Sequence, residues 1–298
     1  TQSMDSTTQK VVDIRHGRAN QYGFLCVVET PEGAKIGLQK HLAIMADISI
    51  NMPSQVVIIE DFLKGKLMNI FDVHPYAIKS LFKVFINGNW LGYTDKVKEL
   101  YDFLKKKKGV NQIHYSVGIV LDIYSKELRI NCDGGRMIRP LLKVENNKLN
   151  LTKEMINDID LSNNTKKINR WENFLIKYHN VIEYLDVEEA EYAMIAMYVD
   201  DLNKNHEIMN RAIAKPNQSG DKVNRYNNTI YVKYSHCEFH PSMMLGSTSS
   251  CIPFCEHNQA PRNIYNFSQA KQGNGIFATN ERYRMDQSYR LANPSVPL

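Results

Sequence analysis

The sequence predicts an α+β protein of several domains, built from mixed small sheets and helices. The chain has 298 residues, which is enough for two or three domains of the usual size, roughly 100–200 residues each. Its hydrophobic share of 43% is ordinary for a globular protein with a buried core. Strand-like and helix-like patterns are mixed along the chain, and polar Asn- and Lys-rich stretches separate them.

The composition leaves the class of partner open. The net charge of +5 and the pI near 8.8 permit a polyanionic partner without requiring one. The first ten residues lack a basic region followed by an apolar run, and nowhere do roughly 18 apolar residues follow one another. We therefore expect a chain that is neither exported nor inserted in a membrane. The scattered cysteines indicate reduced thiols inside a cell: Cys26, Cys132, Cys237, Cys251 and Cys255.

The first ordered segment is predicted to be a strand at 23–28 that runs into a helix. Thr30 has the residue type of an N-cap, and Pro31 then stands at the first helical position. Apolar residues follow at helical spacing, namely Leu38, Leu42 and Met45. Gly33 and Gly37 weaken the first turns of this helix, and two such glycines usually allow another backbone or a ligand to come close.

Residues 56–148 read as a small α+β module. We expect strands at 56–59 and 83–90, the second with a turn at Asn87 and Gly88, and then a helix capped by Thr94 that ends at Gly109. The inward side of this helix is predicted to contain Val97, Leu100 and Leu104. The run of lysines from Lys105 to Lys108 is interpreted as a solvated helix end, where positive charge suits the helix dipole.

The second half of this module is predicted to be all strand. Strands are expected within 115–124 and in 127–142, and Asp133 with Gly134 predicts a hairpin between the two halves of the latter stretch.

Polar connections are expected on either side of one firmer helix. Residues 145–170 are rich in Asn and Lys and predict an exposed connection. Asp186 and Glu189 have the spacing of a capping box, and the helix that follows is predicted to bury Ala190, Met194 and Met197. A linker interrupted by Pro216 and Gly220 then ends near residue 228, where an alternating strand begins.

The stretch 257–273, "HNQAPRNIYNFSQAKQG", reads as a helix with amides and bases where a packed helix has aliphatic residues. On an ideal helix that starts at Pro261, Ile264 and Phe267 share one side and can be buried. Arg262 lies with Asn266 and Gln269 within about 40° on another side, and Lys271 lies about 180° away from Arg262.

No Asp or Glu occurs from 257 to 280, so these cations have no acidic neighbour in the local sequence. A guanidinium matches phosphate with two parallel hydrogen bonds, and amides can bind sugars or backbone without reading bases. This pattern suits a nucleotide or a nucleic-acid backbone. The alternative is an exposed helix face, or an arginine paired with a distant carboxylate.

Metal and enzyme signatures are weak. Six residues could supply soft metal ligands: His236, Cys237, His240, Cys251, Cys255 and His257. However, the stretch 252–254 between the last two cysteines is apolar, and paired CxxC motifs are missing. We therefore do not expect zinc in this portion. Asp158 and Asp160 form the only suggestive carboxylate pair, and GxGxxG, Walker-type and GxSxG motifs are absent. The chain carries no catalytic residue that we can name.

Several long motifs, in consistent order, resemble the second-largest, β-type subunit of multisubunit DNA-dependent RNA polymerases. The resembling stretches are "QYGFLCVVETPEGAKIGL" (21–38), "VFINGNWLG" (84–92), "DGGRMIRPL" (133–141), "EYLDVEEAE" (183–191) and the stretch 236–280. The resemblance implies a central fragment divided into the end of the fork region (1–55), external region 1 (56–148), an Asn-rich connection with external region 2 (149–227), and the start of the hybrid-binding region (228–298). The Asn-rich segments and "HNQAPRN" indicate a large DNA virus version.

The resemblance also implies roles for individual residues. Arg262 is expected to contact the phosphates of the incoming nucleoside triphosphate, and Lys271 and Gln272 are expected to lie against the RNA strand of the RNA–DNA hybrid. The fork motif consists of Glu29, Thr30, Pro31, Glu32 and Gly33.

The implied activity is DNA-directed RNA synthesis, a nucleotidyl transfer for which this subunit alone is inactive. The implied partners are the largest subunit, which mainly binds the catalytic Mg²⁺, other polymerase subunits, the DNA template, nascent RNA and nucleoside triphosphates. The implied location is the host cytoplasm or virion for a viral protein, and otherwise the nucleus. The alternative is a non-enzymatic nucleic-acid-binding module, whose binding would weaken steeply with salt.

Overall fold

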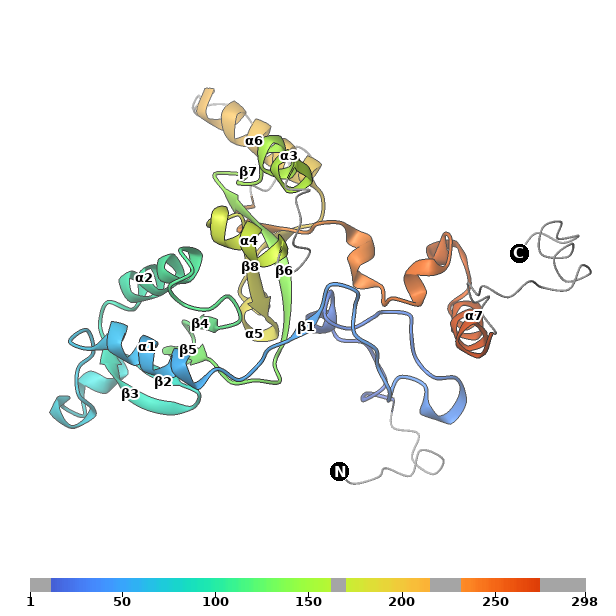
Figure 1. The fold of residues 1–298 in the computed structure, drawn as a ribbon. Coiled ribbons are helices and arrows are strands. Elements are labelled where there is room, and N and C mark those ends of the chain that lie inside the picture. The colour runs from blue at the N-terminus through green and yellow to red at the C-terminus, as the bar shows by residue number, and fades with distance from the viewer. Residues whose placement is uncertain (1–11, 162–169, 215–231, 274–298) are drawn as a thin grey trace, which may run out of the picture.

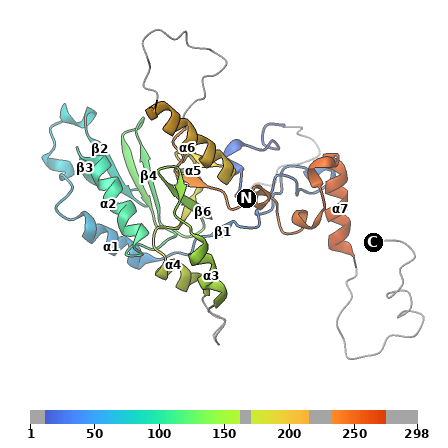
Figure 2. The ribbon, with the colours of Figure 1, turned by 90° about the horizontal axis from the view of Figure 1, so that it is seen from above.

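We describe the fold from a computed structural model, which describes residues 12–161, 170–214 and 232–273. Its helices and two small mixed sheets confirm the predicted α+β class. Figure 1 and Figure 2 both show α7 (Ala260–Gln272) at the end of the molecule opposite α1 and α2, with the long strand β6 between them. No helix in this described part combines the length and the apolar character that a membrane crossing requires.

The first sheet contains the strands of the predicted α+β module. Its order is β3-β2-β5-β4, formed by β2 (Phe82–Ile86), β3 (Asn89–Thr94), β4 (Gly118–Asp122) and β5 (Glu127–Asn131). The predicted turn between β2 and β3 is confirmed, because Asn87 and Gly88 have φ of 48° and 82°, the left-handed pair that a tight hairpin requires. β4 and β5 form a second hairpin, and β5 lies parallel to β2.

Two helices pack on this sheet. The helix α2 (Val97–Gly109) buries the three predicted apolar residues, and α1 (Pro53–Leu63) joins the same hydrophobic cluster. The strand predicted at 56–59 is therefore wrong. The run of β-branched residues favours a strand, but Pro53 starts a helix and the burial of Ile59 and Leu63 against the sheet outweighs that preference.

The second sheet is built around β6 (Met137–Glu145). The other strands are β1 (Asp47–Ile48), β7 (Lys148–Leu149), β8 (Ile182–Asp186), β9 (Ile195–Ala196) and β10 (His236–Cys237). The hairpin predicted at Asp133 and Gly134 is wrong, because β5 and β6 belong to different sheets. A Cβ on Gly134 would lie 2.7 Å from the backbone nitrogen of Asn51, so the glycine allows a close backbone approach where the chain crosses between sheets.

The region 150–214 is more helical than predicted. It contains α3 (Lys153–Leu161), α4 (Arg170–Lys177), α5 (Val187–Glu191) and α6 (Val199–Ala214). The capping box is confirmed, since the Glu189 N–H donates to Asp186 Oδ1 over 2.7 Å and the side chain of Glu189 reaches back. The predicted buried stripe is wrong, because α5 has only five residues and Met194 and Met197 are exposed.

Two further expectations concern the stretch that follows α6. Pro216 and Gly220 lie outside the described residues. Residues 229–231 of the predicted strand also lie outside the described residues. Residues 232–234 do not form a strand, and the next strand is β10.

The end of the molecule that includes α7 consists mainly of loops and short 3₁₀ turns. The turns are Ala19–Gln21, Gly33–Lys35, Pro241–Met244, Ser249–Cys251 and Cys255–His257. The predicted strand at 23–28 is reduced to one bridge between Leu25 and Leu42, and the predicted helix after Pro31 is reduced to a single turn. The reason is local, because Gly33 and Gly37 have φ of 80° and 74°, and a continuous right-handed helix cannot pass through two such positions.

Candidate nucleotide and nucleic-acid site

The helix α7 forms where the sequence predicts it, with Pro261 in its first turn. Ile264 and Phe267 are buried, as the helical projection predicts. Asn263 is buried too, and its amide donates to the carbonyl oxygen of Cys255 over 2.8 Å. One of the amides in this polar stretch therefore anchors the helix and is not available to a ligand.

Arg262, Asn266 and Gln269 lie on the exposed side of α7, as the helical projection predicts. Within the described residues, the Arg262 guanidinium makes no hydrogen bond or ion pair. A guanidinium that has five donors and no protein acceptor is free to bind an anion from solution. The alternative, in which Arg262 pairs with a carboxylate far away in the sequence, is therefore not supported within the described residues.

The fork motif lies in a closed loop, residues 29–39, which we call the fork loop. The hydroxyl of Thr30 accepts a hydrogen bond from the Gly37 N–H (2.8 Å) and donates to the carbonyl of Gln39 (3.1 Å). Arg15 donates to the carbonyls of Ala34 and Ile36, at 2.7 and 2.9 Å. Thr30 thus closes a loop and does not cap a helix.

The close approach predicted from the glycines holds for one of them. A Cβ on Gly37 would lie 2.4 Å from the carbonyl oxygen of Arg15, so a larger residue does not fit there. Gly33 has open space around its Cα and needs glycine only for its positive φ.

The structure brings Glu29 of the fork loop to Lys271 at the end of α7. Lys271 Nζ lies 2.5 Å from Glu29 Oε1, and the Lys271 side chain is 44% exposed whereas Glu29 is 3% exposed. Sequence reasoning missed this pair, since it considered acidic neighbours only within the local stretch. Gln272, the other residue expected to lie against RNA, is exposed beside it.

The residues considered as zinc ligands make separate contacts in the fold. His236 lies against Glu183, and His240 accepts from the Ser242 N–H at the start of a 3₁₀ turn. Cys237 is buried, whereas Cys251 is exposed, and all five cysteines are free thiols. Among the residues that the structure describes, no three or more His, Cys, Asp or Glu side chains gather as a metal site would require.

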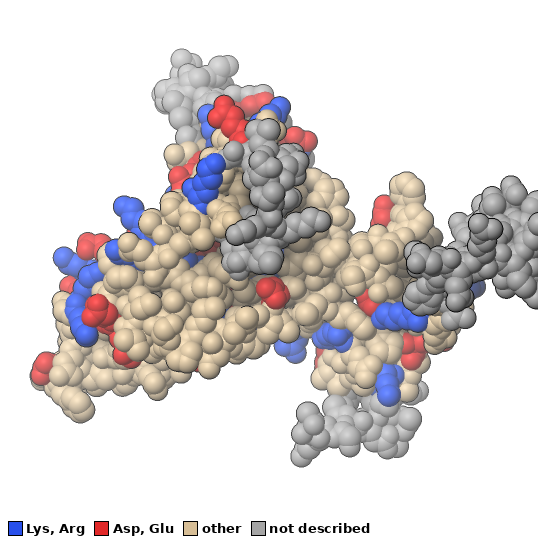
Figure 3. Space-filling model, viewed as in Figure 1, with Lys and Arg blue, Asp and Glu red and all other residues tan. Residues whose placement is uncertain are grey.

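Charge on the visible surface is dispersed. In Figure 3 the Lys and Arg side chains are interleaved with Asp and Glu, both at the edge formed by α1 and α2 and near the fork loop end. The positive net charge therefore does not form one broad patch on this face. The candidate site depends on the individual contacts of its residues.

Comparison with known families covers most of the chain. Profiles of RNA polymerase Rpb2 domains match in consecutive order: domain 3 at residues 2–48, domain 4 at 84–145, domain 5 at 171–241 and domain 6 at 248–298. The fork loop and α7 thus fall in the segments that match domains 3 and 6.

The chain belongs to the family of second subunits of DNA-directed RNA polymerases. It is 40% identical to DNA-directed RNA polymerase subunit 2 of Acanthamoeba polyphaga mimivirus, over 100% of this chain and 24% of that protein. It is 35% identical to DNA-directed RNA polymerase II subunit 2 of Arabidopsis thaliana, over 97% of this chain and 23% of that protein. The corresponding subunit RPB2 of Schizosaccharomyces pombe is also 35% identical, with 97% and 25% covered.

The Rpb2-family chain therefore spans about a quarter of the length of these relatives. The higher identity to the mimivirus subunit agrees with the expected large-virus version.

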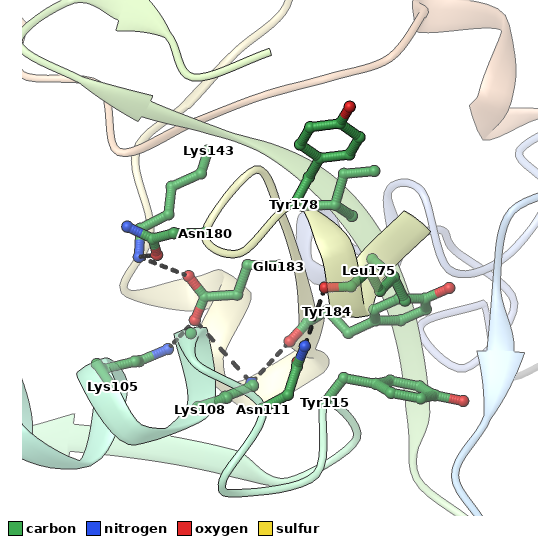
Figure 4. Close-up of a pocket in the computed structure, with 12 residues that line it drawn as sticks. Lys105, Lys108, Asn111, Tyr115, Lys143, Leu175, Tyr178, Asn180, Glu183 and Tyr184 are labelled. Carbon is green, nitrogen blue, oxygen red and sulfur yellow. Dashed lines mark hydrogen bonds and ion pairs between the residues drawn. The ribbon is translucent and has the colours of Figure 1, made fainter. Parts of the chain in front are cut away.

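A buried ionic cluster joins the segments that match Rpb2 domains 4 and 5. Lys105 Nζ on α2 lies 2.7 Å from Glu183 Oε1 on β8 and 2.7 Å from Glu189 Oε1 on α5. Lys108 lies 3.4 Å from Glu189 Oε2, and Lys143 lies 3.7 Å from Glu183 Oε2. Figure 4 shows Lys105 and Lys108 approaching Glu183 from α2, and Lys143 approaching it from β6. The predicted solvated helix end is therefore wrong for Lys105 and Lys108, because α2 packs against β8 and α5.

The carboxylates of this cluster stay ionised in spite of their burial. Burial opposes the charge on Glu183, but the charge of Lys105 and the hydrogen bond from His236 outweigh it and hold the pKa of Glu183 well below its ordinary value. Burial likewise opposes the charge on Glu189, and Lys105 and Lys108 together keep the pKa of Glu189 lowered.

The pKa values of Lys105 and Lys108, the two lysines of α2 in this cluster, shift in opposite directions. Burial disfavours the charged form of both, but the two carboxylates at 2.7 Å raise the pKa of Lys105 well above its ordinary value. For Lys108 burial prevails and lowers the pKa, because its nearest carboxylate oxygen is 3.4 Å away. Lys105 is thus the cation on which the cluster mainly depends.

Proposed function

We propose that the chain is a central section of the second subunit of a DNA-dependent RNA polymerase and takes part in RNA synthesis together with the largest subunit. The observation that carries this proposal is the match of four consecutive Rpb2 domains, combined with an exposed arginine on α7 that has no partner among the described residues. The relatives that the chain resembles are named as DNA-directed RNA polymerase subunits.

In this proposal Arg262 binds the phosphates of the incoming nucleoside triphosphate. A guanidinium on a rigid helix can hold a polyphosphate and stabilise the charge that develops during phosphoryl transfer. Lys271 and Gln272 lie against the RNA strand of the hybrid, on a different side of α7 from Arg262. The two cations then bind phosphates of different molecules, which agrees with their angular separation.

The chemistry requires partners that this chain does not supply. The catalytic Mg²⁺ would be held mainly by the largest subunit and would neutralise the phosphate charge there, and the chain alone would be inactive. Template DNA, nascent RNA and other polymerase subunits complete the assembly. The site of action would be the host cytoplasm or virion for a viral enzyme, and otherwise the nucleus.

The test is Arg262→Ala in the assembled polymerase. Loss of a hydrogen-bonded charge costs about 1.5–3 kcal/mol, so we expect kcat/KM for nucleoside triphosphates to fall roughly 10- to 100-fold. Lys98→Ala, which removes an exposed cation on α2, is the matched control and should leave the kinetics unchanged. Unchanged nucleotide saturation in Arg262→Ala would remove Arg262 from this role.

The isolated chain provides a test of the non-enzymatic alternative. Tight, strongly salt-dependent binding to RNA or DNA by the chain alone would favour the nucleic-acid-binding module over the polymerase subunit.

A further inference from the structure

The buried carboxylate of Glu29 lies where three segments of the chain meet. Its Oε1 is 2.5 Å from Lys271 Nζ at the end of α7 and 3.6 Å from His41 Nδ1. Its Oε2 accepts a hydrogen bond from the Ser249 hydroxyl at 3.3 Å. A carboxylate that is 3% exposed must be paired and hydrogen-bonded, and these contacts meet that requirement from the fork loop side, the 3₁₀ turn and α7.

The surroundings of this carboxylate leave it little freedom. A Cβ on Gly246 would lie 2.7 Å from Glu29 Oε2, so the backbone at Gly246 fits closely over the carboxylate. The Glu29 N–H donates to Cys26 Sγ at 3.3 Å, and that sulfur lies 3.2 Å from the Ser249 hydroxyl. The backbone N–H of Glu29 is therefore held by buried Cys26, and its carboxylate is held in part by buried Ser249.

Unlike Glu29, Lys271 is partly exposed to solvent. Its side chain is 44% exposed. An ammonium group has three donors, and within the described residues Lys271 has one acceptor, the carboxylate of Glu29. The remaining donors can reach a ligand. A free lysine side chain loses conformational entropy when it is fixed, and a lysine that is already held loses less on binding.

We infer that Glu29 is a positioning residue that holds the Lys271 ammonium in place for a phosphate of the RNA strand. The inference rests on the proposed function, because it takes Lys271 to be the group that contacts RNA. Glu29 is itself buried and does not touch the RNA. It acts through Lys271 and ties the fork loop to the helix that carries Arg262.

The ion pair with Glu29 also determines how Lys271 interacts with RNA. Because Glu29 neutralises it, the pair adds little net charge at long range, and Lys271 contributes a directed hydrogen bond. Removal of the Glu29 charge should therefore leave a mobile lysine that still attracts RNA but no longer orients it. The rate of nucleotide addition should then fall while the affinity for the nucleotide is retained.

The test uses assembled polymerase on an RNA primer annealed to template DNA, with single-nucleotide addition as the readout. Glu29→Gln keeps the shape of the side chain and removes its charge, whereas Lys271→Gln removes the cation. We expect each variant to lower kcat about tenfold with KM for the nucleotide changed less than twofold, since misplacement of reacting groups acts on the rate. Glu256→Gln removes an exposed acid just before α7 and should leave kcat unchanged.

The double variant separates positioning from a merely structural role. If Glu29 acts through Lys271, Glu29→Gln combined with Lys271→Gln should be no slower than Lys271→Gln alone. The salt dependence of RNA release should become shallower by about one phosphate contact in Lys271→Gln and not in Glu29→Gln. Lys271→Arg, which keeps a cation beside Glu29, should recover part of the rate.

Three outcomes would overturn the inference. The first is a double variant in which the two defects multiply. The second is a Glu29→Gln polymerase that assembles poorly but has normal kcat per assembled enzyme, which would make Glu29 a structural residue. The third is an impaired Lys271→Gln with a normal Glu29→Gln, which would reject positioning while leaving the RNA contact of Lys271 intact. A normal Lys271→Gln would instead contradict the proposed role of Lys271 itself.

Discussion

Replacement of Lys105 by methionine should destabilise the junction between the Rpb2 domain 4 and domain 5 segments. Methionine has a similar length and keeps the apolar contacts of the side chain, but it leaves the carboxylates of Glu183 and Glu189 without the ammonium that lies 2.7 Å from each. Removal of one partner from a buried ion pair costs about 3–5 kcal/mol.

The remaining donors place the expected loss near the lower end of that range. Glu183 keeps His236 at 3.2 Å and Lys143 at 3.7 Å, and Glu189 keeps the Ile119 N–H at 2.8 Å. We therefore expect a loss of about 3 kcal/mol in the free energy of unfolding. With a urea dependence of about 2–3 kcal/mol per M, the midpoint of unfolding should fall by roughly 1–1.5 M.

Tryptophan fluorescence can report on this junction separately. The chain has two tryptophans, and the indole N–H of Trp171 on α4 donates to the Tyr184 hydroxyl at 2.8 Å, whereas Trp90 lies in the first sheet. In a Trp90→Phe background, urea unfolding followed through Trp171 reports on the segment that contains Glu183 and Glu189.

The matched control is Lys64→Met, which breaks the exposed ion pair with Asp61 at 2.9 Å and should not move the midpoint measurably. A second check is Lys105→Met combined with Glu189→Gln, which removes one of the orphaned charges and should be less destabilised than the sum of the single variants. The reasoning is refuted if Lys105→Met moves the midpoint no further than Lys64→Met does.

Two further predictions concern pH and thiol chemistry. Because the pKa values of Glu183 and Glu189 are lowered in the fold, their contribution to stability is present above the ordinary glutamate range, roughly pH 4.3, and is lost as pH falls through the lower folded values. Urea midpoints measured against pH should fall in acid, and less steeply when both residues are glutamine. Exposed Cys251 should be alkylated rapidly at pH 8, whereas Cys132 and Cys237 should react only on unfolding, because burial raises the pKa of each of these two thiols to about 11. Mass spectrometry of labelled peptides measures the order of labelling. Early labelling of Cys132 or Cys237 would contradict this prediction.

Local sequence rules predicted the elements whose geometry depends on neighbouring residues. Asn87 and Gly88 form the hairpin turn, Asp186 and Glu189 form the capping box, and α7 starts with Pro261 in its first turn. In each case the deciding interaction is a backbone conformation or a hydrogen bond within a few residues. The family resemblance carried by long motifs was likewise contained in the sequence.

Strand pairing could not be obtained in this way. The dipeptide Asp133-Gly134 is a good hairpin signal, yet β5 pairs with β2 and β4, and β6 starts the other sheet. The run at 56–59 favours a strand by residue type, but it forms part of α1 because its apolar side packs on the first sheet. Pairing and packing depend on residues far away in the chain, and propensity is too weak to outweigh them.

The sequence by itself determined which cations lie on which side of α7, and it placed Arg262 on an exposed face. Only the tertiary structure decided which cations are paired. It brings Glu29 to Lys271 and buries Lys105 and Lys108 against Glu183 and Glu189, although the sequence suggested unpartnered or solvated lysines. The physical reason is that a helix fixes the direction of a side chain through local geometry, whereas the electrostatic environment of a charge is set by whatever the folded chain places within a few ångströms of it.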